Sequence, residues 1–171
     1  KILTAKYARE NRIPYFGICL GMQIATIEFA RNACQLKGAN STEFDKDNPH
    51  PVISLQEEQQ GVEDMGATMR LGASDSKILQ DTVAHQLYGK DMISERHRHR
   101  YEFNPAYREQ IEAAGLKISA VSDPEGLVEI VEISDHPFFI GAQFHPEFQS
   151  RPNHPHPIFA GFIAAALKHH G

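Results

Sequence analysis

The sequence contains no tryptophan and only two cysteines, Cys19 and Cys34, among 171 residues. Their spacing matches no structural zinc motif, and a chain of this length with 41% hydrophobic residues can build a core without disulfides. The scarcity of cysteine therefore argues against a disulfide-stapled secreted domain and predicts a reducing, cytoplasmic setting.

Long apolar runs and an excess of positive charge are also missing. No apolar run approaches the roughly 20 residues that span a bilayer, and the first ten residues lack the apolar centre of a signal peptide. Seventeen basic residues against 22 acidic ones give a net charge of -5. General binding to nucleic acid or to a membrane surface needs a positive field, so we expect neither as a partner.

The apolar residues that are present follow the periods of helices and strands. They predict the end of a helix at 2–10, a buried strand at 13–18 and a helix at 20–33. Further strands are expected at 116–122, 126–133 and 138–144. A C-terminal helix is expected at 157–170, with one apolar face made of Ile158, Phe159, Phe162, Ile163, Ala166 and Leu167. This order is typical of a single α/β domain with a mostly parallel sheet flanked by helices.

A polar, turn-rich stretch at 37–66 interrupts this pattern, with one strand expected at 52–55. Irregular inserts of such length in compact domains tend to be functional loops. Two short strands are expected after it, at 67–72 and 76–79, followed by a short helix at 81–89.

Cys19 stands between Gly17 and Gly21 in the segment GICLG, where a predicted strand meets a predicted helix. Small neighbours allow the strained turn of a nucleophile elbow. At the start of a helix, we expect the dipole to lower the pKa of the thiol and the N–H of Leu20 to face a developing oxyanion. The alternative is a small, inert residue in a tight turn.

A histidine and a glutamate follow the last predicted strand, in the segment HPEF. Pro146 favours an extended conformation before it, so His145 and Glu147 are expected on the same side of a stiff, non-helical segment. Glu147 can then hold one ring nitrogen while the other faces Cys19, as the acid does in a catalytic triad. Taken alone, the segment also fits a surface histidine in a turn.

The segments GICLGMQ and FHPEF resemble the triad-type glutamine amidotransferases. ANSTEFD, MGATMRLG, ERHRHRYEFN and HPEFQSRP are similar to segments of the glutaminase domains of the CTP synthase family. These motifs run from residue 14 to residue 152, so the resemblance covers nearly the whole chain. It implies a flavodoxin-like α/β fold and a glutamine-hydrolysing activity that supplies ammonia for the amination of UTP to CTP.

The resemblance also implies roles for individual residues. Cys19 would be the nucleophile that forms a γ-glutamyl thioester, His145 the general acid and base, and Glu147 the partner that orients it. L-Glutamine would be held by Leu20, Gln23, Glu43 and Arg100. The carboxylate of Glu43 suits the α-ammonium of glutamine, and the guanidinium of Arg100 suits its α-carboxylate.

Arginine and histidine alternate in the segment RHRHR. If the segment is extended, Arg96, Arg98 and Arg100 lie on one side and His97 and His99 on the other. The cluster alone also fits a solvated or nucleic-acid-binding segment, although its donors better suit an anionic ligand site. Two histidines at i and i+2 without a third ligand are weak evidence for metal, and we expect no metal site.

In the family, MGATMRLG belongs to a lid through which GTP activates the glutaminase, and this makes Arg70 a candidate GTP contact. The glycine-rich turn that completes the oxyanion hole is absent here, so we expect residues 1–171 to be an N-terminally incomplete amidotransferase domain. No cofactor is implied within it. The synthase domain, with its ATP, magnesium and UTP, is expected outside this chain, in a homotetrameric enzyme.

Two further functions stay open. Another triad-type amidotransferase, or a γ-glutamyl hydrolase, would share Cys19, His145 and Glu147 but feed a different reaction, and RHRHRYEFN and MGATMRLG argue against it. A catalytically silent relative that binds a ligand or acts as a scaffold is an alternative of another class. An intact set of cysteine, histidine and glutamate speaks against that alternative.

Overall fold

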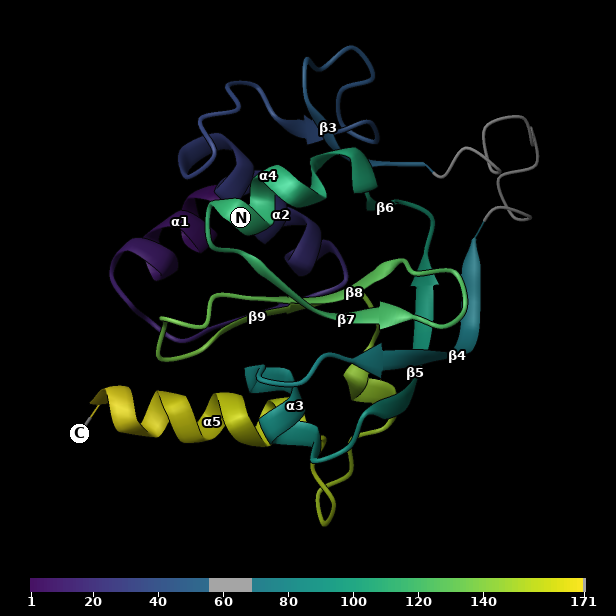
Figure 1. Ribbon diagram of the computed structural model, residues 1–171. Helices are drawn as coiled ribbons and strands as arrows, with labels where there is room; N and C mark the ends of the chain where they lie inside the picture. The colour runs from purple at the N-terminus through teal and green to yellow at the C-terminus, as the bar shows by residue number, and fades with distance from the viewer. Residues whose placement is uncertain (56–68, 171) are drawn as a thin grey trace.

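The computed structural model describes residues 1–55 and 69–170. A six-stranded sheet runs through the middle of the molecule (Figure 1). In spatial order, its strands are β1 (Tyr15–Ile18), β9 (Phe139–Ala142), β8 (Val128–Glu132), β7 (Lys117–Ser122), β4 (Arg70–Ile78) and β5 (Met92–His99).

The sheet is mixed rather than mostly parallel. Within it, β1 and β9 are parallel, and the other four neighbouring pairs are antiparallel. The α/β class predicted from the sequence is confirmed, but the expected parallel majority is wrong for these strands. β7, β8 and β9 follow one another through short connections, and a short connection joins antiparallel strands because a parallel pair needs a long crossover.

Helices cover both faces of the sheet (Figure 1). One face carries α1 (Ile2–Glu10), α2 (Leu20–Asn32) and α4 (Arg108–Ala113), and the other carries α3 (Val83–Tyr88) and α5 (Pro157–His170). Each layer of helices buries its own hydrophobic cluster against the sheet. Burial of this kind supplies most of the stability of a domain of this size.

The first two helices are also joined by a buried ion pair. Arg9 donates two hydrogen bonds of 2.8 Å to the carboxylate of Glu28, whose side chain is fully buried. The fixed pair holds α1 against α2, the helix that begins directly after Cys19.

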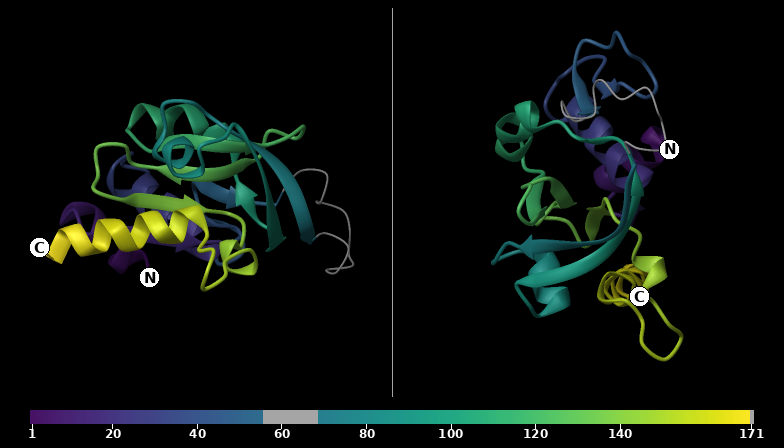
Figure 2. Two further views of the ribbon diagram at one scale, coloured as in Figure 1. Left: turned by 90° about the horizontal axis from the view of Figure 1, so that it is seen from below. Right: turned by 90° about the vertical axis from the view of Figure 1, so that its right-hand side faces the viewer.

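A second, smaller sheet lies beyond α2 and joins the polar insert to the residues that follow the RHRHR segment. It contains β2 (Asn40–Ser41), β3 (Pro51–Ser54) and β6 (Glu102–Phe103). The insert is therefore less irregular than expected as far as residue 55, and its predicted part at 56–66 lies outside the described residues. Among the described residues, the two strands expected at 67–72 and 76–79 are replaced by one strand, β4, whose long pairing with β5 is visible in Figure 2. Residues 67 and 68 of the first expected strand lie outside the described part of the chain.

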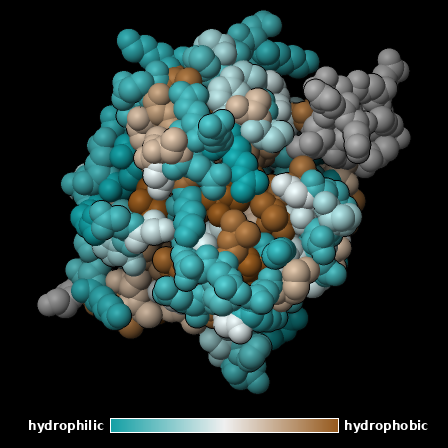
Figure 3. Space-filling view, viewed as in Figure 1, coloured by the Kyte–Doolittle hydropathy of each residue, from teal (hydrophilic) through white to brown (hydrophobic). Residues whose placement is uncertain are grey.

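The apolar face expected on the C-terminal helix is only partly covered by the residues that the structure describes. Ile158 is buried, whereas Ile163 and Leu167 are 55% and 71% exposed. On the opposite layer, Leu3 and Tyr7 of α1 are exposed as well. In the view of Figure 3, hydrophobic atoms gather at the centre of the face, surrounded by polar ones. None of the described helices is long and apolar enough to cross a membrane.

Candidate active site

Cys19 occupies a strained turn between β1 and α2. Its backbone has φ +50° and ψ -103°, a conformation that residues with a side chain rarely adopt. The turn is held by a hydrogen bond of 2.7 Å from the N–H of Cys19 to the carbonyl of Ala142 on β9. The elbow expected from the segment GICLG is therefore present.

The two glycines of the elbow contribute differently. A Cβ atom at Gly17 would lie 2.5 Å from the carbonyl carbon of Gly21, so the strand and the helix approach too closely there for any side chain. At Gly21 the nearest atom to an added Cβ is the hydroxyl oxygen of Tyr15, at 3.8 Å, which is ordinary contact. Close packing therefore requires glycine at position 17 but leaves room for alanine at position 21.

The environment of the thiol differs from the expectation. Burial raises the pKa of Cys19, whereas a backbone hydrogen bond with Leu20 lowers it. The charges of Glu102, Glu147 and Glu43 raise it further. The predicted net lowering by the helix start is thus wrong, because desolvation outweighs the single favourable N–H.

His145 and Glu147 form a close pair at the end of β9. His145 Nδ1 lies 2.6 Å from Glu147 Oε1, which leaves Nε2 of the ring for another partner. Because β1 and β9 are parallel, with Ile18 opposite Ala142, Cys19 and His145 follow their strands at the same edge of the sheet.

The segment that carries this pair is not extended as expected. Pro146–Phe148 forms a 3-10 turn, and the backbone N–H of His145 donates to the carbonyl of Arg96 over 2.8 Å. Proline fits the first position of such a turn because its missing N–H would have no partner there. The turn, rather than an extended chain, brings His145 and Glu147 together.

A cavity of about 260 Å³ opens beside the thiol. It gathers all of the residues predicted to hold glutamine, from α2, from the insert and from the end of β5: Leu20, Gln23, Glu43 and Arg100. Cys19 also lines it, as do residues that the sequence did not single out for this role: Phe44, Met69, Arg98, His99 and Tyr101. The cavity thus offers an acid on one segment and two guanidiniums on another.

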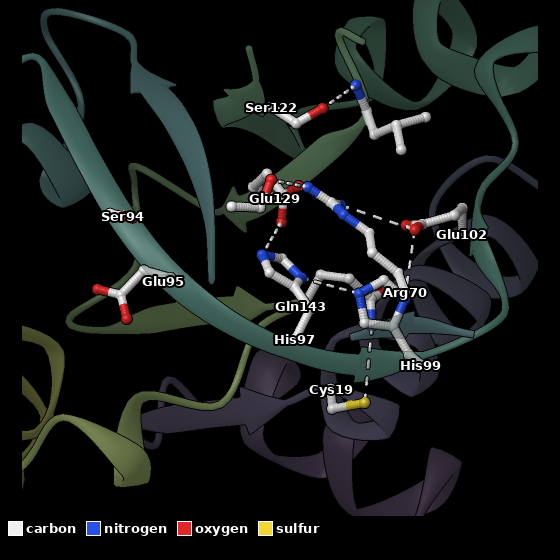
Figure 4. A network of polar contacts seen from close by, with 12 residues as sticks. Cys19, Arg70, Ser94, Glu95, His97, His99, Glu102, Ser122, Glu129 and Gln143 are labelled. Carbon is white, nitrogen blue, oxygen red and sulfur yellow. Dashed lines mark hydrogen bonds and ion pairs between the residues drawn. The ribbon is translucent and has the colours of Figure 1, made fainter. Parts of the chain in front are cut away.

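Two side-chain amides, those of Gln23 and Gln143, form a chain of hydrogen bonds that ends at the thiol. The sequence predicted a role for Gln23 but not for Gln143. Gln23 Nε2 donates to the carbonyl of Tyr101 over 3.0 Å and to Gln143 Oε1 over 3.2 Å. Gln143 Nε2 in turn donates to Cys19 Sγ over 3.7 Å (Figure 4). Gln143 is fully buried and lies in a bend directly after β9. No local motif marks it, because its partners Cys19 and Gln23 are distant in the sequence.

The alternation in RHRHR is confirmed for four of its five residues. On β5, His97 and His99 are buried and Arg96 and Arg98 are exposed. Arg100 lies beyond the last residue of the strand, in a bend, and turns to the cavity instead of joining the row of exposed arginines. Among residues 1–55 and 69–170, no group of three His, Cys, Asp or Glu side chains is arranged to hold a metal ion.

Arg70 points into the protein. Its guanidinium lies 2.5 Å from Glu129 Oε1 and 3.7 Å from Glu102 Oε1, and it donates to Ser74 Oγ over 2.7 Å. Its side chain is 17% exposed. Residues 65–68 of the segment MGATMRLG lie outside the described part of the chain, and the GTP contact at Arg70 stays a prediction.

Comparison with known proteins agrees with this geometry. The protein CTP synthase of Moorella thermoacetica is 56% identical over 171 residues, which are all of this chain and 32% of that protein. That of Staphylococcus aureus is 58% identical over 169 residues, again 32% of its length. The chain therefore spans about a third of the length of these relatives.

A solved structure is similar as well. The glutaminase domain of Trypanosoma brucei CTPS, with bound acivicin, superposes with a TM-score of 0.92 and 45% identity, over 98% of this chain and 65% of that one. The family model for glutamine amidotransferase class-I matches residues 1–165. Elbow, cavity and family match agree: the chain belongs to the class-I glutamine amidotransferase family.

Proposed function

We propose that this chain is the glutaminase domain of a CTP synthase and that it hydrolyses L-glutamine through Cys19. One observation carries the proposal. A single cavity beside the elbow cysteine gathers Leu20, Gln23, Glu43 and Arg100 from segments far apart in the sequence. A histidine with a carboxylate partner follows the strand next to the elbow.

The cavity suits the two ends of an amino acid. Glu43 supplies a negative charge for the α-ammonium group, and Arg100 supplies a fork of donors for the α-carboxylate. The side-chain amide of the substrate then extends toward Cys19. We expect Gln23 to act mainly by holding Gln143 and the carbonyl of Tyr101 in place, since its amide nitrogen is used by both.

The reaction follows from these positions. Cys19 Sγ attacks the amide carbon of glutamine and passes its proton to His145, while the N–H of Leu20 stabilises the oxyanion. His145 then gives this proton to the leaving nitrogen, and ammonia departs from a γ-glutamyl thioester. Water, deprotonated by the same histidine, hydrolyses the thioester to glutamate and restores the thiol. Glu147 keeps the ring of His145 in one orientation.

The fate of the ammonia belongs to the same proposal. The relatives are about three times as long as this chain and bear the name CTP synthase, which supports a second domain that aminates UTP with ATP and magnesium. GTP would activate the glutaminase, and the whole enzyme would be a cytoplasmic homotetramer. These properties rest on the likeness to the family.

Glutamate release from glutamine tests the proposal in the complete polypeptide that the gene encodes. We expect Cys19→Ser to abolish release, and Cys34→Ser, the matched control at the other cysteine, to retain it. Equal activity of wild type and Cys19→Ser, or no activity in either, would contradict the assignment of the nucleophile. Glutamine hydrolysis that does not respond to GTP and yields no CTP from UTP and ATP would favour another amidotransferase.

A further inference from the structure

A cluster of polar side chains links three strands of the main sheet to β6 of the small sheet (Figure 4). It consists of Arg70 on β4, His97 and His99 on β5, Glu102 on β6 and Glu129 on β8. The four residues other than Arg70 are at most 6% exposed. His99 also lines the cavity, so the cluster reaches the proposed glutamine site.

Four of these groups form a row. His97 Nδ1 and His99 Nε2 are 2.9 Å apart and share a hydrogen bond. The other nitrogen of each ring faces a carboxylate: His97 Nε2 lies 3.6 Å from Glu129 Oε2, and His99 Nδ1 lies 3.3 Å from Glu102 Oε1. The order along the row is therefore Glu129, His97, His99 and Glu102.

The ends of this row contain buried polar atoms that lack a hydrogen bond to any described residue. They are His97 Nε2 and Glu129 Oε2 at one end, and His99 Nδ1 and Glu102 Oε2 at the other. Unsatisfied groups of this kind are costly in a protein interior. His97 Nε2 and Glu129 Oε2 face each other, and His99 Nδ1 faces the other oxygen of Glu102, Oε1. A suitable placement of protons can therefore satisfy both ring nitrogens and Glu129 Oε2.

The charges in the cluster do not balance unless a carboxyl group holds a proton. Burial lowers the pKa of His97 and of His99 to about 3, so both rings are neutral near pH 7. Two ionised carboxylates would then face one guanidinium and leave a buried negative charge. One proton on a carboxyl group removes that charge.

Distances to Arg70 indicate which carboxyl group holds the proton. Glu129 receives a hydrogen bond of 2.5 Å from Arg70, whereas Glu102 lies 3.7 Å from the same nitrogen. Burial raises the pKa of Glu102 to about 8 and that of Glu129 to about 7, which is the same order. Glu125 adds to the negative potential at Glu129, and His145 faces the two histidines with its own charge when protonated.

We propose that Glu102 is a positioning residue that works as a neutral carboxylic acid. Its O–H donates to His99 Nδ1, His99 Nε2–H donates to His97 Nδ1, and His97 Nε2–H faces the ionised Glu129, which pairs with Arg70. Each ring carries one proton, and three of the four unsatisfied atoms take part in the row, the exception being Glu102 Oε2.

The consequence for the active site rests on the proposed glutaminase function. The row holds β5 and β6 together on either side of Arg100, which lines the cavity. A neutral Glu102 also removes a negative charge that would otherwise raise the pKa of Cys19. The thiolate is therefore easier to form while Glu102 keeps its proton.

Three variants of the complete polypeptide test this proposal: Glu102→Ala, Glu102→Gln and Glu129→Gln. An amide at position 102 can donate to His99 Nδ1 as the acid does. We expect Glu102→Ala to lower kcat for glutamate release by about tenfold, which is the usual cost of about 1.4 kcal/mol for one lost buried hydrogen bond. Glu102→Gln should keep most of the wild-type kcat. Glu129→Gln should not keep it, because this change leaves Arg70 without its counter-charge.

Infrared spectroscopy provides a readout that needs no activity. We expect a C=O stretching band of a protonated carboxyl group at pH 6 to 7 that disappears as the pH passes about 8. Aspartate variants keep the charge of the cluster and change only the carboxyl group that carries the band. The band should therefore shift or weaken in Glu102→Asp and stay unchanged in Glu129→Asp. A band that changes only in Glu129→Asp would place the proton on Glu129, and no band in the wild type would show an ionic cluster; either result overturns the proposal. Failure of the glutaminase function itself appears separately, in Cys19→Ser.

Discussion

His145 and Glu147 are paired through a bond of 2.6 Å that exists because Pro146 starts a 3-10 turn between them. Glu147 is 46% exposed and His145 is 21% exposed, so water competes with this bond more than in a buried triad. The pairing fixes Nδ1 of the ring and leaves Nε2 for another partner, which we propose is the thiol of Cys19.

Glu147→Gln should lower kcat for glutamine hydrolysis by roughly 100-fold or more, with little change in KM. Loss of the acid in comparable triads costs about 10,000-fold, and we expect less here because the pair is partly exposed. Steady-state kinetics with glutamine measure the effect. Glu109→Gln, at an exposed position of α4, is the control and should keep wild-type kinetics. A kcat for Glu147→Gln equal to that of the control would remove Glu147 from the mechanism.

We expect Gln143 to affect glutamine hydrolysis, although it is not among the residues predicted to hold glutamine. Replacing it with methionine removes the donor to Cys19 Sγ and the acceptor for Gln23, and keeps the volume of the side chain. We expect at least a tenfold loss of kcat/KM. Thr26→Val, which changes a buried side chain whose hydroxyl donates to the carbonyl of Met22, is the matched control for a polar-to-apolar change. Equal effects of the two substitutions would show that Gln143 acts through packing alone.

The two glycines of the elbow should respond differently to alanine. Gly17→Ala places a methyl group against the backbone of Gly21, and it should displace the strand from the helix and abolish activity. Gly21→Ala meets no atom closer than 3.8 Å and replaces glycine within a helix, which favours stability by about 0.5 to 1 kcal/mol. Thermal unfolding and glutaminase assays on both variants decide this. Wild-type stability and activity in Gly17→Ala would show that β1 and α2 can move apart at the elbow.

The buried histidines make the fold sensitive to acid. The pKa of His97 is lowered to about 3 in the folded protein, against about 6.5 in an unfolded chain. Only the unfolded chain therefore binds this proton between those values, so stability is present above pH 6.5 and is lost as the pH falls toward 3.

His97→Gln should make this pH dependence shallower by up to one proton, about 1.4 kcal/mol per pH unit below pH 6. Urea unfolding at pH 4, 5, 6 and 7 measures the slope. His154→Gln, at an exposed position, should leave the slope unchanged. An identical slope in wild type and His97→Gln would mean that His97 is not held neutral.

The pair between α1 and α2 should contribute strongly to stability. Glu28→Gln leaves the guanidinium of Arg9 without its buried partner, and it should lower the free energy of unfolding by about 3 kcal/mol. Glu10→Gln removes a half-exposed carboxylate that lies 3.5 Å from the same guanidinium and 3.8 Å from Lys6, and it should cost less than about 1 kcal/mol. Denaturant titrations of both variants test the difference, and equal costs would contradict it.

The sequence predicted the elements of this fold well and their pairing poorly. Apolar periodicity located α2, β1, β7, β8 and β9, because each buries a face that the pattern records. The direction of neighbouring strands depends on connections and on the whole sheet, which local pattern does not encode. The single strand β4 was divided in two because its polar residues pair with β5 at the edge, where little apolar burial is needed.

For the candidate site, too, the sequence predicted what a local motif marks and missed what depends on the tertiary fold. Cys19 and His145 were found because their local motifs carry chemistry, and Glu43 and Arg100 entered through the family resemblance. Gln143 and Glu129 contact partners that are distant in the sequence, and Glu102 lies near His99 in the chain but meets Arg70 only in the fold. No local motif marks these three residues. The pKa of Cys19 was misjudged because the helix start is visible in the sequence, whereas burial and nearby carboxylates come from the tertiary fold.

The alternation of β5 makes the length of this strand as constrained as its composition. Its arginines face solvent and its histidines face the interior, and successive side chains change sides at every residue. Deleting or inserting one residue between Ile93 and His97 would turn guanidinium groups into the buried cluster and imidazoles into water. A single substitution in this strand leaves the other side chains on their own faces of the sheet, whereas a shift by one residue moves them to the opposite face.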